Sequence, residues 1–492
     1  MRTSGILLPV SSLPSPYGIG SLGQAAYDFI DFLAESGQTW WQVLPLGPTG
    51  YGDSPYQSCS AFASNPYFID LDSLAEDGYL EERELGKANL KNEAGRIDYY
   101  DLYVKRFPVL KKACSAVSPQ DPELLEYLTG NHFWIEDYAL FMTIKEEQKM
   151  RPFWEWPSEL RYLEEEKERE IRESRKEALH FWRTVQFLFH KQWMRMKGYA
   201  NGKGIRILGD IPIYVSADSC ELWRQPVLFQ TDEAGNPTNV AGCPPDDFSP
   251  AGQLWGNPLY DWSYHKKTGF QWWIKRLEHS GCFYDAVRID HFRGFSGYYS
   301  ISAGNITAVE GAWKEGPGRD FIGVIKERVS WLPVIAEDLG FLTPDVQELL
   351  EYSGFPGMKV LQFGFSSCGE NGYLPHNYGK NSVVYTGTHD NPTTKEWAES
   401  LEREGLEFAM KYLGIKEPRQ LTRAMIRAVC ASVADTAIIP MQDWLELGAE
   451  ARINTPSTLG DNWIWRLSED SLGITLAGEI REMTELYGRN PR

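Results

Sequence analysis

The residues best placed to do chemistry lie in one short stretch, from Tyr284 to Gly294. Its first half, Tyr284 to Ile289, is dominated by apolar and β-branched residues and predicts a buried strand. Arg288 and Asp290 stand two residues apart at the end of that strand, so they share one face. A carboxylate beside a guanidinium stays ionised and can act as a nucleophile. A purely structural Arg–Asp pair that caps the strand fits this stretch equally well.

Two further acidic residues stand at the ends of short apolar runs. Glu337 closes the run Pro333 to Glu337, and Asp390 follows the run Ser382 to Thr386. In a parallel barrel the C-terminal strand ends meet at one mouth, so these carboxylates should converge with Asp290. Two converging carboxylates suit glycoside chemistry, in which one attacks the anomeric carbon and the other protonates the leaving oxygen. The third can bind sugar hydroxyls and hold the ring distorted.

Flat aromatic side chains near the predicted mouth loops would suit the apolar CH face of a sugar. The candidates are Trp40, Tyr56, Phe248, Trp255 and Phe363. Taken singly, such a ring is more often a core residue than a sugar platform, by about two to one for Trp40 and about evenly for Trp255, where the polar neighbours Gln253 and Asn257 favour a site.

Eight apolar runs supply strands for such a barrel. They are Gly5 to Val10, Thr39 to Leu46, Ile205 to Ile213, Tyr284 to Asp290, Pro333 to Glu337, Met358 to Phe365, Ser382 to Thr386 and Thr436 to Met441. Helical stretches separate most of them, such as Leu22 to Ser36, Phe270 to His279, Gly323 to Val329 and Thr343 to Tyr352. Strand alternating with helix implies a parallel sheet, and eight such units close a (β/α)8 TIM barrel. We therefore predict an α/β fold in which residues 1–492 form a single catalytic barrel.

Two intervals are too long to be ordinary barrel loops. Residues 58–204 separate the second and third strands, and Ser158 to Lys197 within them reads as helical, with charges spaced for a solvated face. We expect a mostly helical insertion whose apolar half packs on the barrel. Residues 215–261 are rich in Gly, Pro and Asn, and we expect Gly242 to Pro258 to lack regular structure and to form a lid or substrate wall.

The charge balance bounds the partners of the protein. The chain has 68 acidic and 49 basic residues, for a net charge of −19. Such a field argues against nucleic acid and anionic membranes as partners and favours a neutral substrate.

Cysteine usage and hydropathy bear on the compartment. Seven Cys are scattered without a CxxC pair, which is typical of a reducing environment. The first apolar run is short and ends at Pro9, and the chain has no 18-residue apolar segment. These features predict a cytoplasmic protein.

Two rival interpretations come from other classes. In a metal hydrolase, the adjacent pairs Asp290-His291 and His389-Asp390 would be metal ligands. Only eight His are present, no His-x-His motif follows the first strand, and Arg288 would compete with a cation. A non-enzymatic glucan-binding barrel would leave three strand-end acids unexplained. We expect no metal or organic cofactor, and hence activity that survives a chelator.

Seven motifs, spread over nearly the whole chain, carry a resemblance to a known family. They are Gly5 to Pro14, Gln42 to Gln57, Gly209 to Val215, Pro244 to Pro258, Arg288 to Gly294, Ala336 to Gly340 and Gly387 to Asn391. In this order they make the chain resemble 4-α-glucanotransferases of the amylomaltase or disproportionating-enzyme type, relatives of the α-amylases. The resemblance implies a retaining transferase that moves α-1,4-glucan segments from a donor to the 4-hydroxyl of an acceptor glucan or glucose. A hydrolase on the same scaffold is the alternative, because water can also resolve a glucosyl-enzyme.

The resemblance also implies roles for the strand-end residues. Asp290 matches the nucleophile, Glu337 the acid/base and Asp390 the carboxylate that stabilises the transition state. Arg288 matches the group that keeps the nucleophile ionised. Asp210 matches a polar residue at the end of the third strand.

The remaining matches concern sugar binding. His291 and His389 match sugar-binding histidines, Tyr56 matches a ring platform, and Tyr51 matches an aromatic residue of a remote glucan site. Gln253 and Trp255 belong to the lid motif, in which Asp247 stands where an aromatic residue is common. We expect α-1,4-glucans, maltooligosaccharides and glucose as binding partners, and a monomer or weak homo-oligomer.

Overall fold

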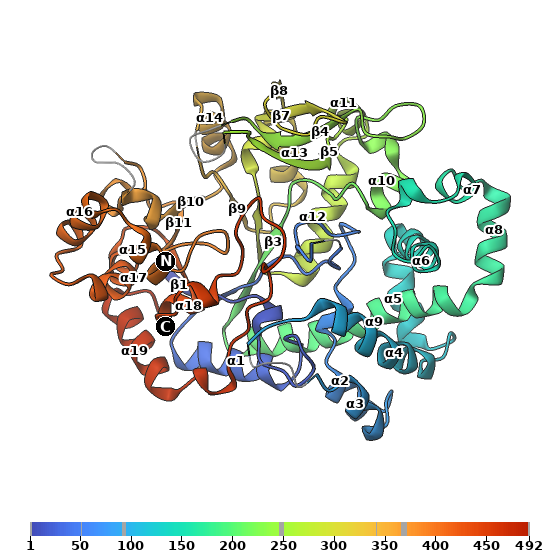
Figure 1. Cartoon of the computed structure of the whole chain (residues 1–492), viewed down its shortest axis with the longest axis horizontal. Coiled ribbons are helices and arrows are strands. Elements are labelled where there is room, and N and C mark those ends of the chain that lie inside the picture. Colours follow the sequence, from blue (N-terminus) through green and yellow to red (C-terminus); the bar gives the residue numbers. More distant parts are fainter. Residues whose placement is uncertain are drawn as a thin grey trace.

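Eight parallel strands form a closed barrel at the centre of the protein (Figure 1). The computed structural model describes residues 2–50, 52–90, 95–245, 250–340, 342–365 and 371–490. The barrel strands are β1 (Thr3–Leu7), β2 (Trp40–Gln42), β3 (Arg206–Ile211), β6 (Ala286–Ile289), β9 (Val334–Ala336), β10 (Gly357–Val360), β11 (Ser382–Tyr385) and β12 (Thr436–Pro440). They follow one another around the barrel in chain order, and β12 closes on β1 with Thr3 opposite Thr436.

The predicted barrel is confirmed, with all eight apolar runs forming strands in the predicted order. Each strand is shorter than its run, and most strands end before the run does, where the chain turns into the mouth loops. Every residue of β6 and of β11 is buried, as expected of strands with the barrel core on one side and helices on the other.

Helices surround the barrel and confirm the four stretches named from the sequence, with somewhat different ends. The helices that follow barrel strands are α1 (Gln24–Glu35), α12 (Gln271–Phe283), α13 (Gly318–Arg328), α14 (Pro344–Ser353), α15 (Thr394–Ser400), α16 (Arg403–Leu413), α17 (Leu421–Ala431), α18 (Met441–Trp444) and α19 (Ile474–Leu486). In α1 the buried side chains Ala26, Phe29, Ile30 and Leu33 recur at helical spacing and face the barrel.

Residues 58–204 lie on one flank of the barrel, at the right of Figure 1. They form α2 (Leu71–Glu76), α3 (Glu82–Ala88), α4 (Tyr99–Ala116), α5 (Pro122–Gly130), α6 (His132–Glu147), α7 (Ser158–Arg161), α8 (Glu165–Ser174) and α9 (Lys176–Gly202). The stretch predicted as helical from Ser158 to Lys197 is thus three helices. On α9, the fully buried Trp193 donates its indole N–H to the Phe283 carbonyl at 3.0 Å, which fixes this helix to the end of α12.

The expectation that Gly242 to Pro258 lacks regular structure is wrong. The segment contributes β4 (Asn239–Cys243) and β5 (Gln253–Pro258) to an antiparallel sheet completed by β7 (Gly297–Ser302) and β8 (Gly311–Glu315). The short helices α10 (Cys220–Arg224) and α11 (Trp262–Lys267) flank these strands. A Cβ at Gly242 would lie 2.2 Å from the Gln253 carbonyl oxygen, so glycine marks close strand contact here rather than a loop.

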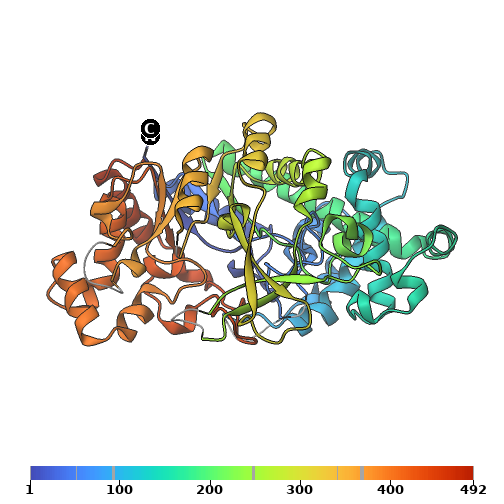
Figure 2. The same cartoon turned by 90° about the horizontal axis from the view of Figure 1, so that it is seen from above.

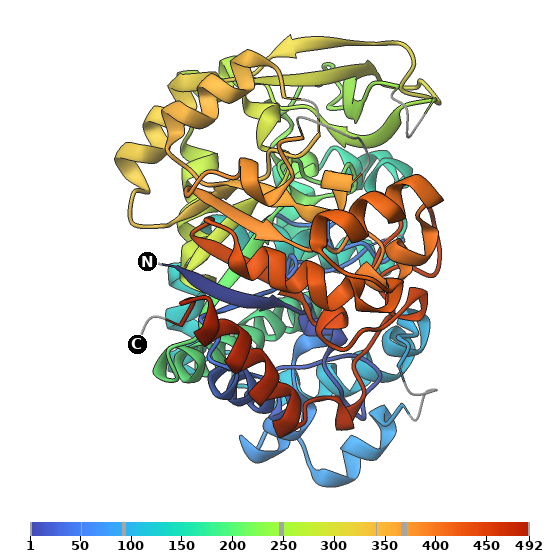
Figure 3. The same cartoon turned by 90° about the vertical axis from the view of Figure 1, so that its left-hand side faces the viewer.

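This four-stranded sheet lies at the top of Figure 1, while residues 58–204 and the C-terminal helices occupy opposite ends of the molecule (Figure 2). The two chain ends lie close together on one side (Figure 3). Among the described helices, none combines the length and apolar character needed to cross a membrane.

Tight packing between β3 and the residues before β6 makes a glycine indispensable. A Cβ added at Gly209 would lie 2.3 Å from the Tyr284 ring, so we expect Gly209→Ala to lower the free energy of unfolding by about 1–3 kcal/mol. Gly198 is the control, because a Cβ there meets nothing within 4 Å in α9, and Gly198→Ala should add about 0.5–1 kcal/mol. Calorimetry measures the melting temperature of both variants, and equal shifts would contradict the close packing at Gly209.

Candidate active site

The C-terminal ends of neighbouring strands place the predicted acidic residues. Asp210 lies in β3 directly opposite Arg288 of β6, and Ile289 lies opposite Ala336 of β9. Asp290 and Glu337 are the next residues of these two strands. Their side chains therefore enter the same end of the barrel, where the connecting loops form a pocket in barrel enzymes.

Arg288 holds two carboxylates at once. Its Nη1 donates to Asp210 Oδ1 at 2.8 Å and Oδ2 at 2.7 Å, and its Nη2 donates to Asp290 Oδ1 at 2.8 Å. The side chain of Asp210 is fully buried and that of Arg288 is 4% exposed, whereas that of Asp290 is 30% exposed. Asp210 thus anchors the cation, and Asp290 is the member of the trio that can reach a ligand.

Burial raises the pKa of Asp290, and the Arg288 guanidinium limits that rise. A second consequence of the ion pair is geometric, since Asp290 offers one oxygen to Arg288 and keeps the other for chemistry. This is the arrangement that a nucleophilic carboxylate needs.

Glu337 has a different environment. The backbone N–H of His291 donates to its Oε2 at 2.7 Å, and the N–H of Leu339 donates to its Oε1 at 2.7 Å. Burial and the nearby charge of Asp290 together raise the pKa of Glu337 to about 7. A pKa raised toward neutrality suits a group that both gives and takes protons.

Asp390 is kept ionised. Burial acts to raise its pKa, but His389, whose Nε2 lies 3.3 Å from Oδ2, and the Asn454 amide, which donates to Oδ1 at 2.6 Å, outweigh it. They hold the pKa of Asp390 at about 2. Burial acts to lower the pKa of His389, yet its partner Asp390 raises it above the ordinary value. The pair presents a fixed negative group and a donor to the pocket.

Tyr56 connects the two halves of this cluster. Its hydroxyl donates to Asp210 Oδ2 at 2.9 Å, and its ring stacks on that of His389 with 5.1 Å between centroids. The Trp463 ring lies 5.8 Å from that of Tyr56, which extends the aromatic surface. Tyr56, Asp210, Arg288, Asp290 and the His389–Asp390 pair are thus brought together.

The predicted lid residues gather on the other side of Asp290. Trp255 of β5 meets the His291 ring edge to face at 4.8 Å, and its indole N–H donates to Gln253 Oε1 at 3.1 Å. Burial lowers the pKa of His291 to about 3, so its imidazole is neutral. His291 has a positive φ of 54°, and this left-handed turn directs its backbone N–H to Glu337.

Some aromatic candidates do not join the site. Trp40 begins β2, so it lies at the opposite end of the barrel, where its indole N–H donates to Thr3 Oγ1 at 3.2 Å; its expected place near the mouth is wrong. Phe363 lies just after β10, at the mouth end. Tyr51, Asp247 and Phe248 lie outside the described residues.

The sequence analysis missed three residues of the site region, all of which follow the last barrel strand, β12. Asn454 and Trp463 come from the long segment after α18. Asp443 is 1% exposed and accepts hydrogen bonds from the hydroxyls of Thr386 at 2.5 Å and Thr394 at 2.7 Å, which brace the loop that carries Asp390. The eighth strand has a mouth loop too, and its polar and aromatic residues were the available signal.

The site therefore holds three carboxyl groups in three states: one beside a cation, one that titrates near neutrality and one firmly ionised. Among the described residues, no group of three or more His, Cys, Asp or Glu side chains is arranged to hold a metal ion. The arrangement can supply a nucleophile, a proton donor and acceptor, and a fixed negative charge.

Comparison with known proteins identifies relatives of the whole chain. A family model described as 4-alpha-glucanotransferase matches residues 8–472. The 4-alpha-glucanotransferase of Clostridium butyricum is 45% identical over 483 residues, covering 98% of this chain and 99% of the relative. That of Thermus thermophilus is 46% identical over 500 residues, covering 99% of both chains. The solved structure of amylomaltase from Streptococcus agalactiae in complex with acarbose superposes with a TM-score of 0.97, at 41% identity, covering 100% of both chains.

The buried pair of Asp210 and Arg288 should dominate the stability of the barrel mouth. Breaking a buried ion pair typically lowers the free energy of unfolding by about 3–5 kcal/mol. For Asp210→Asn we expect a loss of about 3 kcal/mol, because Asp290 still faces the guanidinium. Tyr56→Phe is the control, since it removes only one hydrogen bond to the same carboxylate, worth about 1 kcal/mol. Equal melting temperatures of the two variants would show that Asp210 is not the anchor.

Proposed function

The chain belongs to the 4-alpha-glucanotransferase family, and we propose that Asp290, Glu337 and Asp390 perform its reaction by a retaining double displacement. The protein transfers 4-α-glucan segments between sugars, and the hydrolase alternative is not favoured. The observation that supports the proposed roles best is that the three carboxyl groups meet at one end of the barrel with different partners: Arg288 for Asp290, two backbone N–H groups for Glu337, and His389 with Asn454 for Asp390.

In the first half-reaction the protonated Glu337 gives its proton to the glycosidic oxygen as the C1–O bond breaks. Asp290 attacks C1 with the oxygen that Arg288 leaves unoccupied, and the shortened donor chain departs with a free 4-hydroxyl. The ionised Asp390 binds sugar hydroxyls and stabilises the positive charge that develops on the ring.

In the second half-reaction the acceptor sugar enters where the departed chain lay. Glu337, now ionised, takes the proton of the acceptor 4-hydroxyl, and that oxygen attacks C1 and displaces Asp290. The second inversion restores the α configuration. A pKa near 7 allows one group to serve both directions of proton transfer.

We assign the surrounding side chains to sugar binding. Tyr56, with His389 stacked on it, offers a flat platform, and the neutral His291 offers a ring nitrogen for a hydroxyl. Arg288 and Asp210 act through Asp290, which they orient. Gln253 and Trp255 border the acceptor side, and Tyr51 remains our candidate for a separate glucan site.

Donors in this proposal are α-1,4-glucans and maltooligosaccharides, and acceptors include glucose. We further propose a cytoplasmic monomer or weak homo-oligomer. The free thiols of Cys59, Cys114, Cys220, Cys282 and Cys430 are in keeping with a reducing compartment. Residues 58–204 and 215–261 are, in this view, insertions within one catalytic unit rather than separate domains.

Transfer can outcompete hydrolysis only if the acceptor is held ready while water is kept out of position. Correct placement can be worth about 10⁵–10⁸ M in effective concentration, which is enough to overcome the excess of water. Trp255 is suited to both tasks, because its ring packs on His291 next to the nucleophile. We propose that residues 244–258 act as a lid over the acceptor side.

Maltotriose tests the function directly. The protein should convert it into glucose and a ladder of longer maltooligosaccharides, and Asp290→Ala should lower the rate by about three orders of magnitude or more, whereas Asp320→Ala on the surface should not. A fluorinated α-glucosyl fluoride should label Asp290, as peptide mass spectrometry would show. In a substrate complex the carboxyl groups of Asp290 and Glu337 should lie about 5–5.5 Å apart, and a spacing near 9 Å would rule out the covalent route.

The pH profile tests Glu337. With maltooligosaccharide donors, kcat/KM should fall as the pH rises through about 7. Near this pH, the raised pKa of Glu337, its side chain loses the proton that the leaving oxygen needs. An α-glucosyl fluoride needs no such proton, so formation of the glucosyl-enzyme from it should lack this alkaline limb and should survive in Glu337→Gln. An unchanged limb with the fluoride donor would assign the titration to another group.

Replacement of Trp255 tests the lid. Trp255→Ala should lower transfer more than hydrolysis, so that glucose and short sugars accumulate at the expense of long products. If Trp255 only anchors the loop, the variant should lose stability and both activities in parallel. A well-folded variant with an unchanged ratio of transfer to hydrolysis would contradict the lid.

A further inference from the structure

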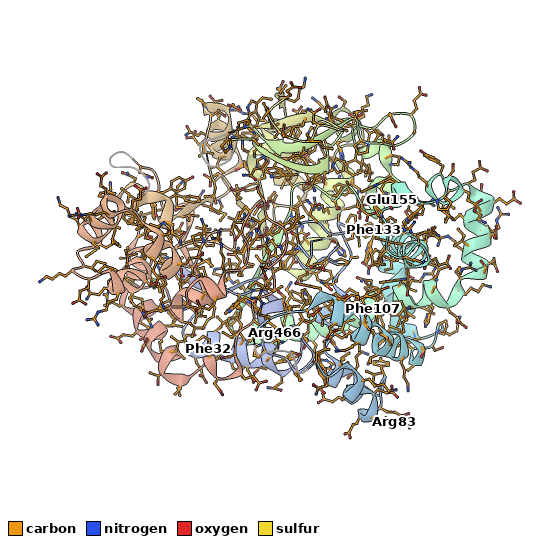
Figure 4. All side chains as sticks on the ribbon, in the orientation of Figure 1. Phe32, Arg83, Phe107, Phe133, Glu155 and Arg466 are labelled. Atoms are coloured by element: carbon orange, nitrogen blue, oxygen red, sulfur yellow. The ribbon has the colours of Figure 1, made fainter. Side chains whose placement is uncertain are left out.

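A second pocket lies where residues 58–204 meet the barrel. It has a volume of about 180 Å³ and lies among α6, α10, α11 and α12, near the position of Phe133 in Figure 4. None of its lining residues belongs to the carboxylate cluster, and α10 and α11 bracket the strands of the proposed lid. The pocket is therefore separate from the active site but joined to the segment that covers it.

Aromatic rings form its walls. Phe62 lies at the centre, with ring centroids 5.2 Å from Phe133, 6.3 Å from Trp134 and 5.9 Å from Trp272. Phe62, Trp134 and Trp272 are 6%, 5% and 8% exposed and pack on one another, so the rings that remain partly exposed at this pocket are Phe133 and Tyr264. Flat rings that line a concave site are the usual surface for the CH face of a sugar.

Polar side chains surround the opening. The amides of Gln225 and Gln271 have no hydrogen-bond partner among the described residues, and Lys275 lies on the rim with its ammonium 5.3 Å from the Phe133 ring. Amides and an ammonium group can donate hydrogen bonds to hydroxyl oxygens, and the amide oxygens can accept them. Together they offer several hydrogen bonds at the mouth of an apolar hollow.

Of the two acidic residues of this pocket, Asp137 is paired, whereas Glu221 bonds through Oε1 and its buried Oε2 has no hydrogen-bond partner among the described residues. Asp137 lies 2.9 Å from Arg224, and Glu221 accepts hydrogen bonds from the Ser60 hydroxyl at 3.0 Å and the Ala61 N–H at 2.9 Å. The described lining residues therefore include no cluster of free carboxylates that could bind a cation. Lys275 is the only basic side chain in this described part of the lining, which is too few for an anion site. A neutral ligand fits this balance.

We propose that this pocket binds one pyranose ring of a neutral sugar, either free glucose or the end unit of a glucan chain. The volume of about 180 Å³ is below the roughly 300–1,000 Å³ of pockets for drug-sized ligands, so a single ring suits it better than an oligosaccharide. The partly exposed rings of Phe133 and Tyr264 take the CH face, while Gln225, Gln271 and Lys275 bind hydroxyls.

The position of the pocket gives the bound sugar a structural consequence. Through its carboxylate, Glu221 of α10 accepts hydrogen bonds from Ser60 and Ala61, which follow the loop that carries Tyr56. Along the chain, α10 leads to β4, the strand that precedes the proposed lid. A sugar held between α6 and α10 would therefore stabilise the segments that border both sides of the active site.

Two arms of a calorimetric titration distinguish the sources of the sugar. Glucose alone is not consumed by a transferase, so the first arm titrates the unmodified protein with glucose and does not depend on the proposed catalytic roles. The second arm titrates Asp290→Asn with maltotriose. We expect binding at the pocket in at least one arm, and a crystal soaked with that sugar should show it against Phe133 and Tyr264.

Variants on one helix locate the binding. Gln271→Ala and Lys275→Ala should weaken the pocket site at least tenfold and leave the active site unchanged, because both residues are exposed on α12. Glu278→Ala, exposed on the same helix but outside the pocket, should change neither. The proposal is overturned if neither sugar binds beyond the active site, or if Gln271→Ala and Lys275→Ala bind as Glu278→Ala does.

Discussion

The guanidinium of Arg288 is the interaction on which the mouth of the barrel depends. It is buried between Asp210 and Asp290, and each contact solves a different problem. The doubly bonded Asp210 compensates a cation that could not otherwise be buried, and it also positions Tyr56. The single bond to Asp290 leaves one oxygen of a partly exposed carboxylate available. The register that sets Asp210 opposite Arg288 is therefore a requirement of the chemistry as well as of the fold.

Much of this could be predicted from the sequence because the decisive information is local. Each acidic residue stands at the end of its own apolar run, and in a parallel barrel all such ends meet. Asn454 escaped because no apolar run precedes it closely. Trp40 was misplaced because β2 has only three residues, so a side chain at its start lies at the wrong end of the barrel. Short strands leave little margin for deciding which end is the mouth.

The four-stranded sheet of β5, β4, β7 and β8 could not be predicted for the opposite reason, because its strands are stabilised by partners that are distant in the sequence. Strand β4 pairs with β5 on one edge and with β7, which follows Asp290 along the chain, on the other. Glycine-rich sequence is a poor strand former until a partner backbone approaches closely, and at Gly242 that approach excludes any side chain. The same pairing joins strand β5 of the proposed lid and the strand that follows Asp290 in one sheet.

His291 is where that coupling reaches the chemistry. Its left-handed backbone is uncommon for a residue with a side chain, and it directs the N–H to Glu337 while the ring packs on Trp255. A hydrogen bond to the ionised carboxylate favours loss of its proton, whereas burial opposes that loss. In the proposed lid, displacement of Trp255 would free the His291 ring and weaken this hydrogen bond. Closure over an acceptor would then have two effects through one residue, excluding water and preparing Glu337 to take the proton of the acceptor hydroxyl.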